Sequence, residues 1–279
     1  MTEYERISIG DDYVNTILAN TLEMRGFLVK PIDNYIYFSQ GNIIEDLPRL
    51  ERLLDSLNVK FTRDGNNLYI LEDEIDETTL NHILWYPARN HESDSGAGWY
   101  GWKYFIKRNH GPKIKTFVLE TGVALLVKAI SAAGIVTDVS CDGHGRRAPR
   151  IFFCGKQNAA WFKLIFENKF SDTSFHYEWY LKNTESISIA LTAKSKDGRW
   201  DLEKVLEDTL LMARSILKEA NKLSKMKKEI FGGNYKTTRK IVREMDFEEH
   251  IQWMKQRYDA YLEQKEGEMI GGMNSGNAN

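Results

Sequence analysis

A long, uninterrupted helical pattern constrains the fold of this chain more than any other feature. From Asp201 to about Phe231, apolar residues recur with the period of an amphipathic helix, and no proline or glycine interrupts them. Gly232-Gly233 ends this pattern, and a second helical pattern runs from Thr237 to Gln264. We therefore expect a helical hairpin over residues 201–266, with its turn at the two glycines.

The apolar stripe of this hairpin is longer than a small domain needs to cover its sheet. The stripe favours self-association, so we expect a homo-oligomer held through the helices of residues 201–264. The second half of the first helix is rich in lysine, but Glu219 and Glu229 interrupt the basic run. A solvated helix face explains that run, and we expect no direct binding to nucleic acid.

Composition supports two folded domains within 279 residues, of which 42% are hydrophobic. The net charge of −2 provides no overall field that would attract nucleic acid or an anionic membrane. Two cysteines are too few for a disulfide scaffold, the acidic start does not resemble a signal peptide, and no stretch is long and apolar enough to span a membrane. We therefore expect a cytoplasmic protein without membrane contact, in the host cell if the protein is viral.

Residues 1–88 have the pattern of a small α+β domain. A hairpin signal lies at Asp64-Gly65-Asn66-Asn67, between two apolar runs. The other expected elements are helices at 11–25, 44–57 and 77–85 and a strand at 35–38.

Residues 89–116 form an expected linker with an unusual cluster of aromatic residues. Trp99, Tyr100 and Trp102 lie in a polar, glycine-rich setting, which makes them candidate partner-binding residues together with Arg146 and Arg147. A second α+β domain is expected at 117–200 and a flexible tail at 267–279. The order helix, strand, strand, helix, strand, strand predicts helices on one face of a mainly antiparallel sheet.

The loop from Ser140 to Arg147 carries the densest chemistry of the chain. Its sequence, Ser-Cys-Asp-Gly-His-Gly-Arg-Arg, lies between two apolar runs that read as strands, and Cys154 follows the second run. A loop held by a sheet can present such side chains to a substrate or partner. If the protein is an enzyme, its catalytic residues are Cys141, Asp142, His144 and Arg146.

Three chemical interpretations of this loop remain open. A metal could bind Cys141, His144 and Cys154, but a closed zinc site needs a fourth ligand, for which only the distant His91, His110 and His176 are candidates. We therefore expect neither a tightly bound structural zinc nor another cofactor.

The second interpretation is a thiolate nucleophile at Cys141, with a pKa lowered by His144 and the arginines and opposed by Asp142. No cysteine-hydrolase signature surrounds it. The third is phosphate binding by the glycines and arginines of the loop, although no Walker or dinucleotide motif is present. A tight strand connection whose charges face water would explain the same residues.

The segment from Val123 to Phe153, with Ala-Gly-Ile, Ser-Cys-Asp-Gly-His-Gly and Pro-Arg-Ile-Phe-Phe, resembles proteins of bacteriophages and prophages. The whole chain is similar to the phage-encoded Gabija anti-defence proteins in its size, its two α/β parts with a helical extension and its lack of a complete catalytic set. The similarity is strongest over residues 117–165 and carries over no functional residue.

This resemblance implies a host–virus inhibitor that oligomerises around a bacterial nuclease–helicase defence complex and blocks DNA binding and cleavage. Our first hypothesis is therefore a non-enzymatic protein that acts by protein–protein interaction. The alternative is a small cytoplasmic enzyme, or a nucleotide- or phosphate-binding protein, that uses the loop from Ser140 to Arg147.

Overall fold

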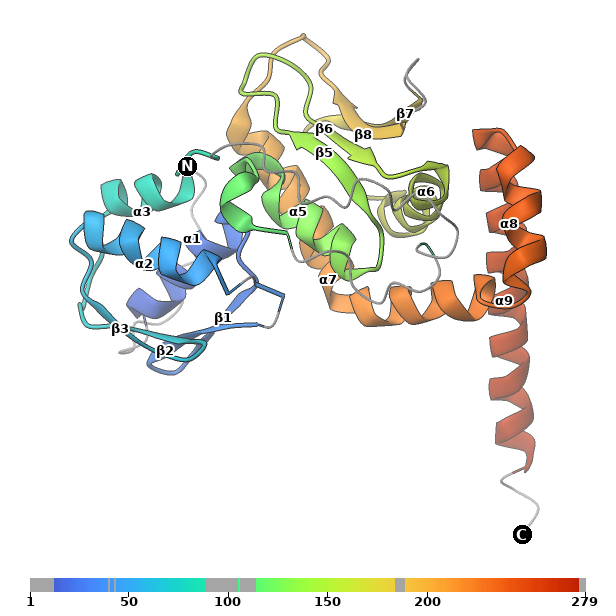
Figure 1. Ribbon diagram of the computed structural model, residues 1–279, viewed down its shortest axis with the longest axis horizontal. Helices are drawn as coiled ribbons and strands as arrows, with labels where there is room; N and C mark the ends of the chain where they lie inside the picture. Colours follow the sequence, from blue (N-terminus) through green and yellow to red (C-terminus); the bar gives the residue numbers. More distant parts are fainter. Residues whose placement is uncertain are drawn as a thin grey trace.

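The computed structural model describes residues 13–39, 41–42, 44–88, 105, 114–183 and 189–275. Two α+β lobes and a C-terminal set of helices make up this part of the chain (Figure 1). Each lobe contains one antiparallel sheet of 4 strands. The α+β class predicted from the sequence is therefore confirmed.

The N-terminal lobe contains three helices and four short strands. In chain order these are α1 (Tyr13–Arg25), β1 (Val29–Ile32), β2 (Tyr35–Phe38), α2 (Asp46–Ser56), β3 (Phe61–Asp64), β4 (Asn67–Ile70) and α3 (Glu77–Leu84). The sheet order is β1-β2-β4-β3. The predicted hairpin is present, with Asp64 paired to Asn67 so that Gly65 and Asn66 form its turn.

The central lobe follows a short 3₁₀ turn, η1 (Thr116–Val118). Its elements are α5 (Thr121–Ala132), β5 (Thr137–Cys141), β6 (Arg150–Phe153), α6 (Lys156–Phe170), β7 (Glu178–Asn183), β8 (Ile189–Lys194) and α7 (Leu202–Phe231). The sheet order is β5-β6-β8-β7. Phe117, predicted as the first residue of the central domain, instead packs in the apolar core of the N-terminal lobe.

The two lobes repeat one architecture. Each runs helix, strand, strand, helix, strand, strand, helix, and each sheet places its fourth strand between its second and third. The sequence shows no internal repeat. Two segments can share a topology without sharing residues, because the topology depends on where apolar positions and turns fall. The likeness between the lobes is therefore visible only in the structure.

Helix α5 forms the junction between the lobes. All of its residues from Thr121 to Ser131 are buried, and it packs against α7 on one side and α1 on another. Gly26, which ends α1 at a positive φ, lies so close to α5 that an added Cβ would be 2.5 Å from that of Ala124. The Thr121 hydroxyl links α5 to the N-terminal lobe by donating to the carbonyl of Leu84. Within the central lobe, the Thr209 hydroxyl of α7 donates to the carbonyl of Gly122 in α5.

The junction also buries an unusual group of charged side chains. Lys128 of α5 donates to the hydroxyl of Thr116, and Arg25 of α1 donates to the Thr116 carbonyl. The carboxylate of Asp46 accepts from the backbone N–H of Thr116. Burial, with a contribution from Arg25, lowers the pKa of Lys128 to about 8 against the opposing effect of Asp46. Charge burial at this depth is costly, so we expect the stability of the junction to depend on pH.

The C-terminal helices depart from the predicted hairpin. The second expected helix is divided into α8 (Tyr235–Glu244) and α9 (Phe247–Ser275), and α9 packs more extensively against α6 than against α7. A capping box causes the division: the Asp246 carboxylate accepts from the Glu249 N–H, and the Glu249 carboxylate accepts from the Asp246 N–H.

The far end of α9 points away from the rest of the molecule (Figure 1). The helix continues to Ser275, within the segment that was predicted to be a flexible tail. None of the helices in the described ranges is both long and apolar enough to cross a membrane.

Candidate metal centre

The β5–β6 hairpin and the start of α5 bring the candidate side chains together. Cys141 is the last residue of β5 and pairs with Arg150 of β6, so residues 142–149 form the connection between the strands. Glu120 is the N-cap residue of α5 and has an extended backbone. Because α5 contacts β5, Glu120 lies directly beside the end of that strand.

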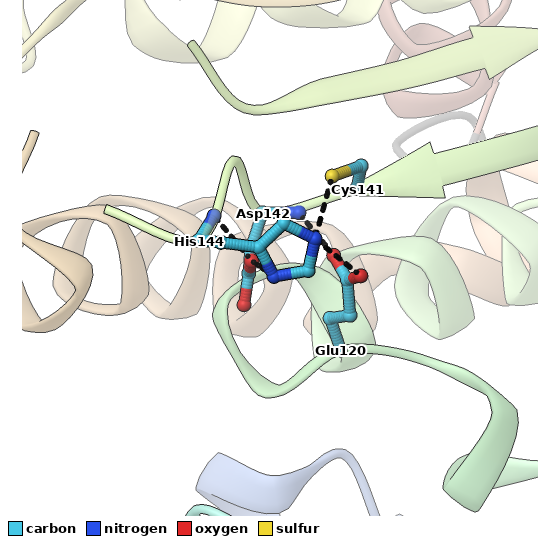
Figure 2. A group of neighbouring side chains, drawn as sticks. All are labelled: Glu120, Cys141, Asp142 and His144. Carbon is cyan, nitrogen blue, oxygen red and sulfur yellow. Dashed lines mark hydrogen bonds and ion pairs between the residues drawn. The ribbon is translucent and has the colours of Figure 1, made fainter. Parts of the chain in front are cut away.

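One ligand atom from each of Glu120, Cys141, Asp142 and His144 lies within 4.8 Å of the other three (Figure 2). The His144 Nε2 atom is 3.2 Å from Glu120 Oε1 and 3.6 Å from Cys141 Sγ. The other ring nitrogen, Nδ1, is 3.6 Å from Asp142 Oδ1. The imidazole is therefore placed between a carboxylate and a thiol on one edge and a second carboxylate on the other.

Backbone N–H groups fix three of these side chains. Glu120 Oε2 accepts from the Asp142 N–H at 2.6 Å, and Cys141 Sγ accepts from the Gly143 N–H at 3.3 Å. Asp142 accepts from two N–H groups, those of His144 at 3.0 Å and Gly122 at 3.3 Å. The Asp142 carboxylate thus links the loop to the start of α5. Glu120 Oε1 and Cys141 Sγ face the imidazole of His144.

The loop reaches this geometry through three consecutive residues in the left-handed region. Gly143, His144 and Gly145 have φ values of 84°, 53° and 66°. An added Cβ at Gly143 would overlap the carbonyl oxygen of Arg147. His144 carries a Cβ in a conformation that costs roughly 1–2 kcal/mol for an ordinary residue. Such strain, held by the surrounding hydrogen bonds, is typical of functional sites.

The electrostatics differ from those predicted for a reactive thiolate. Burial, followed by the nearby Glu120 and Asp142, raises the pKa of the Cys141 thiol, although the Gly143 N–H opposes this shift. Burial and Asp142 also raise the pKa of Glu120, against the Asp142 N–H and His144. The interpretation of Cys141 as a thiolate with a lowered pKa is therefore not supported, because burial, the largest contribution, and both carboxylates raise the thiol pKa.

The structure separates the second cysteine and the described candidate histidine from the centre. Cys154 is buried at the opposite end of the β5–β6 hairpin, about 13 Å along the strand from the position that pairs with Cys141. His176 contacts Glu207 instead, with its Nε2 atom 2.6 Å from the carboxylate. The predicted ligand set of Cys141, His144 and Cys154 is therefore wrong in its third member. His91 and His110 lie outside the described residues.

The candidate partner-binding residues divide into two groups. Arg146 and Arg147 are exposed, and their backbone N–H groups both donate to the Gly143 carbonyl, at 3.0 and 3.1 Å. Trp99, Tyr100 and Trp102 lie outside the described part of the chain.

Glu120 is the site residue that sequence reasoning did not find. A complete helix separates Glu120 from the loop in the sequence, and a single glutamate at that distance forms no recognisable ligand motif with Cys141 or His144. The helical pattern of the sequence runs from Phe117 to Ala133 and includes Glu120, whereas the structure begins α5 at Thr121 with Glu120 as its N-cap residue. The pattern therefore gave no signal that this glutamate caps a helix.

Comparisons with known proteins add no relative to these observations. A scan against protein-family models matches no family, and searches of curated proteins and of solved structures return no match. The functional argument therefore rests on the geometry of the centre.

Proposed function

We propose that the protein binds one divalent transition-metal ion of the zinc class through Glu120, Cys141 and His144. The observation that carries this proposal is the spacing of the donor atoms. With ordinary zinc bond lengths, a tetrahedral site separates a sulfur and a nitrogen ligand by about 3.6 Å and an oxygen and a nitrogen ligand by about 3.3 Å. The corresponding distances around His144 Nε2 are 3.6 and 3.2 Å.

The chemistry of the donors favours the same class of ion. A thiolate and an imidazole are poor ligands for calcium or magnesium, which prefer oxygen, but they are common ligands for zinc. The thiolate of Cys141 and the carboxylate of Glu120 would together balance the charge of a divalent ion. When bound, such an ion supplies Lewis acidity at the surface of the loop.

Asp142 has a positioning role in this proposal. Its Oδ1 atom faces His144 Nδ1 at 3.6 Å, so that Nε2 is directed at Glu120 and Cys141. A carboxylate behind the ligating histidine fixes the ring orientation and increases its basicity. The N–H groups on Glu120 Oε2 and Cys141 Sγ complete an outer shell around the three ligands.

The direct test is metal analysis of the full chain purified without chelator, followed by zinc titration calorimetry of the metal-depleted protein. We expect one site per chain, and a loss of affinity of more than about 100-fold in Cys141→Ser, since even outer-shell substitutions cost about 10–100-fold. Cys154→Ser is the matched control and should bind as the wild type does. Equal affinities of Cys141→Ser and wild type would refute the proposal.

A second candidate function is nucleophilic catalysis by Cys141, with His144 as base and Asp142 behind it. The order thiol, imidazole, carboxylate favours this function. Two observations place it second: the pKa of the thiol is raised, and His144 Nε2 is closer to Glu120 than to the thiol. Alkylation of Cys141 that is fast in metal-depleted protein and unaffected by zinc would favour the nucleophile over the metal ligand.

The inhibitor hypothesis stays a proposal of partner binding, and the Gabija resemblance gains no relative from the comparisons. Its support is limited to the exposed pair Arg146 and Arg147, which a protein partner could contact. A pull-down from a bacterial lysate identifies such a partner. If the double variant Cys141→Ser/His144→Ala inhibits as the wild type does, inhibition is independent of the metal centre.

A further inference from the structure

We infer that the metal centre has an open coordination position that accepts an oxyanion of the phosphate type, with Arg146 and Arg147 as its recognition residues. This inference rests on the proposed metal site and goes beyond it. It assigns the centre to the class that exchanges ligands, as opposed to the closed class that only stabilises a fold.

The first step is the number of protein ligands. Asp142 accepts from the N–H groups of His144 and Gly122, and its Oδ1 atom faces Nδ1, the ring nitrogen turned away from the other donors. It therefore supports the site from behind. Three protein ligands remain, and a tetrahedral ion of the zinc class then keeps one position for an external ligand.

The second step is the direction of that position. The side chain of Asp142 is 7% exposed and that of Glu120 is 17% exposed, whereas that of His144 is 54% exposed. Solvent therefore reaches the centre from the His144 side. Figure 2 shows the imidazole between the two carboxylates, with Cys141 at the end of its strand above them.

The third step is the charge of the loop that carries His144. Arg146 and Arg147 follow His144 in this loop, both are exposed, and within the described ranges neither forms an ion pair. With the ion neutralised by Glu120 and Cys141, the two guanidinium groups outweigh the one remaining carboxylate of the loop, that of Asp142. Their forked N–H donors match the oxygens of a phosphate group.

The test uses the full chain loaded with Co²⁺, whose visible absorption reports changes in coordination, and inorganic phosphate as the probe. We expect phosphate to change the spectrum saturably while the metal stays bound, and chloride at equal ionic strength to leave the spectrum unchanged. The double variant Arg146→Ala/Arg147→Ala should load Co²⁺ as the wild type does. The phosphate concentration that half-saturates its spectral change should be about tenfold higher or more, since hydrogen bonds to charged groups are lost. The control is the double variant Arg239→Ala/Lys240→Ala, which removes two consecutive exposed basic residues of α8.

Failure of the inference and failure of the metal proposal give different results. A Co²⁺-loaded protein whose spectrum ignores phosphate would overturn the inference and leave the metal site standing, as would equal phosphate responses of wild type and the Arg146/Arg147 variant. A protein that takes up no Co²⁺ would overturn both. Metal content measured after gel filtration distinguishes phosphate binding from removal of the metal.

Discussion

The N-terminal and central lobes share their order of elements and their sheet order but differ in the first hairpin. In the N-terminal lobe Ile32 pairs with Tyr35, so Asp33 and Asn34 alone connect β1 to β2. In the central lobe residues 142–149 connect β5 to β6 and carry Asp142, His144 and the two arginines. The same scaffold therefore holds a minimal turn in one lobe and the candidate site in the other.

This difference shows which parts of the fold are structural and which are available for chemistry. Both connections contain a non-glycine residue at positive φ, Asp33 at 44° and His144 at 53°. The second lies beside the N-cap glutamate of α5, Glu120, and follows a strand that ends in Cys141. The candidate metal centre thus combines a longer loop with one residue at a helix terminus, Glu120, and one at a strand end, Cys141.

The largest effect is expected from adding a methyl group at one turn glycine of each lobe, Gly143 between β5 and β6 and Gly65 between β3 and β4. Gly143→Ala should abolish metal binding and destabilise the central lobe by more than about 2 kcal/mol, because the positive φ is strained and the Cβ overlaps the Arg147 carbonyl. Gly65, in the β3–β4 turn of the N-terminal lobe, also has a positive φ but open space around an added Cβ, so Gly65→Ala should cost only about 1–2 kcal/mol and leave metal binding unchanged. Chemical denaturation and zinc titration of both variants provide the comparison. Equal losses of unfolding free energy and of zinc affinity in Gly143→Ala and Gly65→Ala would show that the two turns tolerate an added methyl group equally.

The junction between the lobes should respond to pH through Lys128. Because its folded-state pKa is lowered from 10.5 to about 8, the folded protein binds fewer protons than the unfolded chain between these values. Stability should therefore rise with pH across this window, by about 3 kcal/mol at about 1.4 kcal/mol per pKa unit.

Lys128→Met should lack this rise, whereas Lys204→Met, an exposed lysine on α7, should retain it. The measurement is the free energy of unfolding in denaturant at several pH values from 7.5 to 10.5. Parallel pH profiles for wild type and Lys128→Met would contradict a buried charged lysine at the junction.

Asp142→Asn should weaken zinc binding by about 10–100-fold, because the amide cannot replace the carboxylate behind the ligating histidine. The fold should change less, since the amide oxygen can still accept from the Gly122 or His144 N–H. Asp197→Asn, at an exposed turn, is the control. If zinc affinity is insensitive to Asp142→Asn, the carboxylate has no positioning role.

The smallest effect concerns backbone strain at Asp33 and His144, the positive-φ residues of the β1–β2 and β5–β6 connections. Asp33→Gly and His144→Gly each remove a conformational cost of roughly 1–2 kcal/mol and add about 0.5–1 kcal/mol of chain entropy cost, so each should stabilise the metal-free protein by up to about 1.5 kcal/mol. Only His144→Gly should lose metal binding. Thermal denaturation with and without zinc separates the two effects. Destabilisation of the metal-free protein by His144→Gly would show that the imidazole supports the fold instead.

Periodicity predicted most of the fold, and its failures have local causes. The patterns of α1, α2, α3, α6 and α7 are long enough to identify each helix. The division between α8 and α9 was missed although the capping-box spacing of Asp246 and Glu249 is present in the sequence. Strand β1, with proline and lysine in Val-Lys-Pro-Ile, has too weak an apolar alternation to be recognised.

The candidate site was only partly predictable. Cys141, Asp142 and His144 are adjacent in sequence and were found together, because a turn keeps such neighbours close. Glu120 and the exclusion of Cys154 depend on the register of β5 and β6 and on the docking of α5. These are tertiary relations, which the spacing of residues along the chain does not encode.

The measurement that tests the central claim most directly is zinc titration calorimetry of Glu120→Gln, because Glu120 is the ligand that only the tertiary structure assigns. Glu203→Gln, an exposed glutamate in the first turn of α7, is the matched control. We predict a loss of zinc affinity of more than about 100-fold in Glu120→Gln with an unchanged fold by circular dichroism, and wild-type affinity in Glu203→Gln. Wild-type zinc affinity in Glu120→Gln, or no zinc binding by the wild-type chain, would contradict the account.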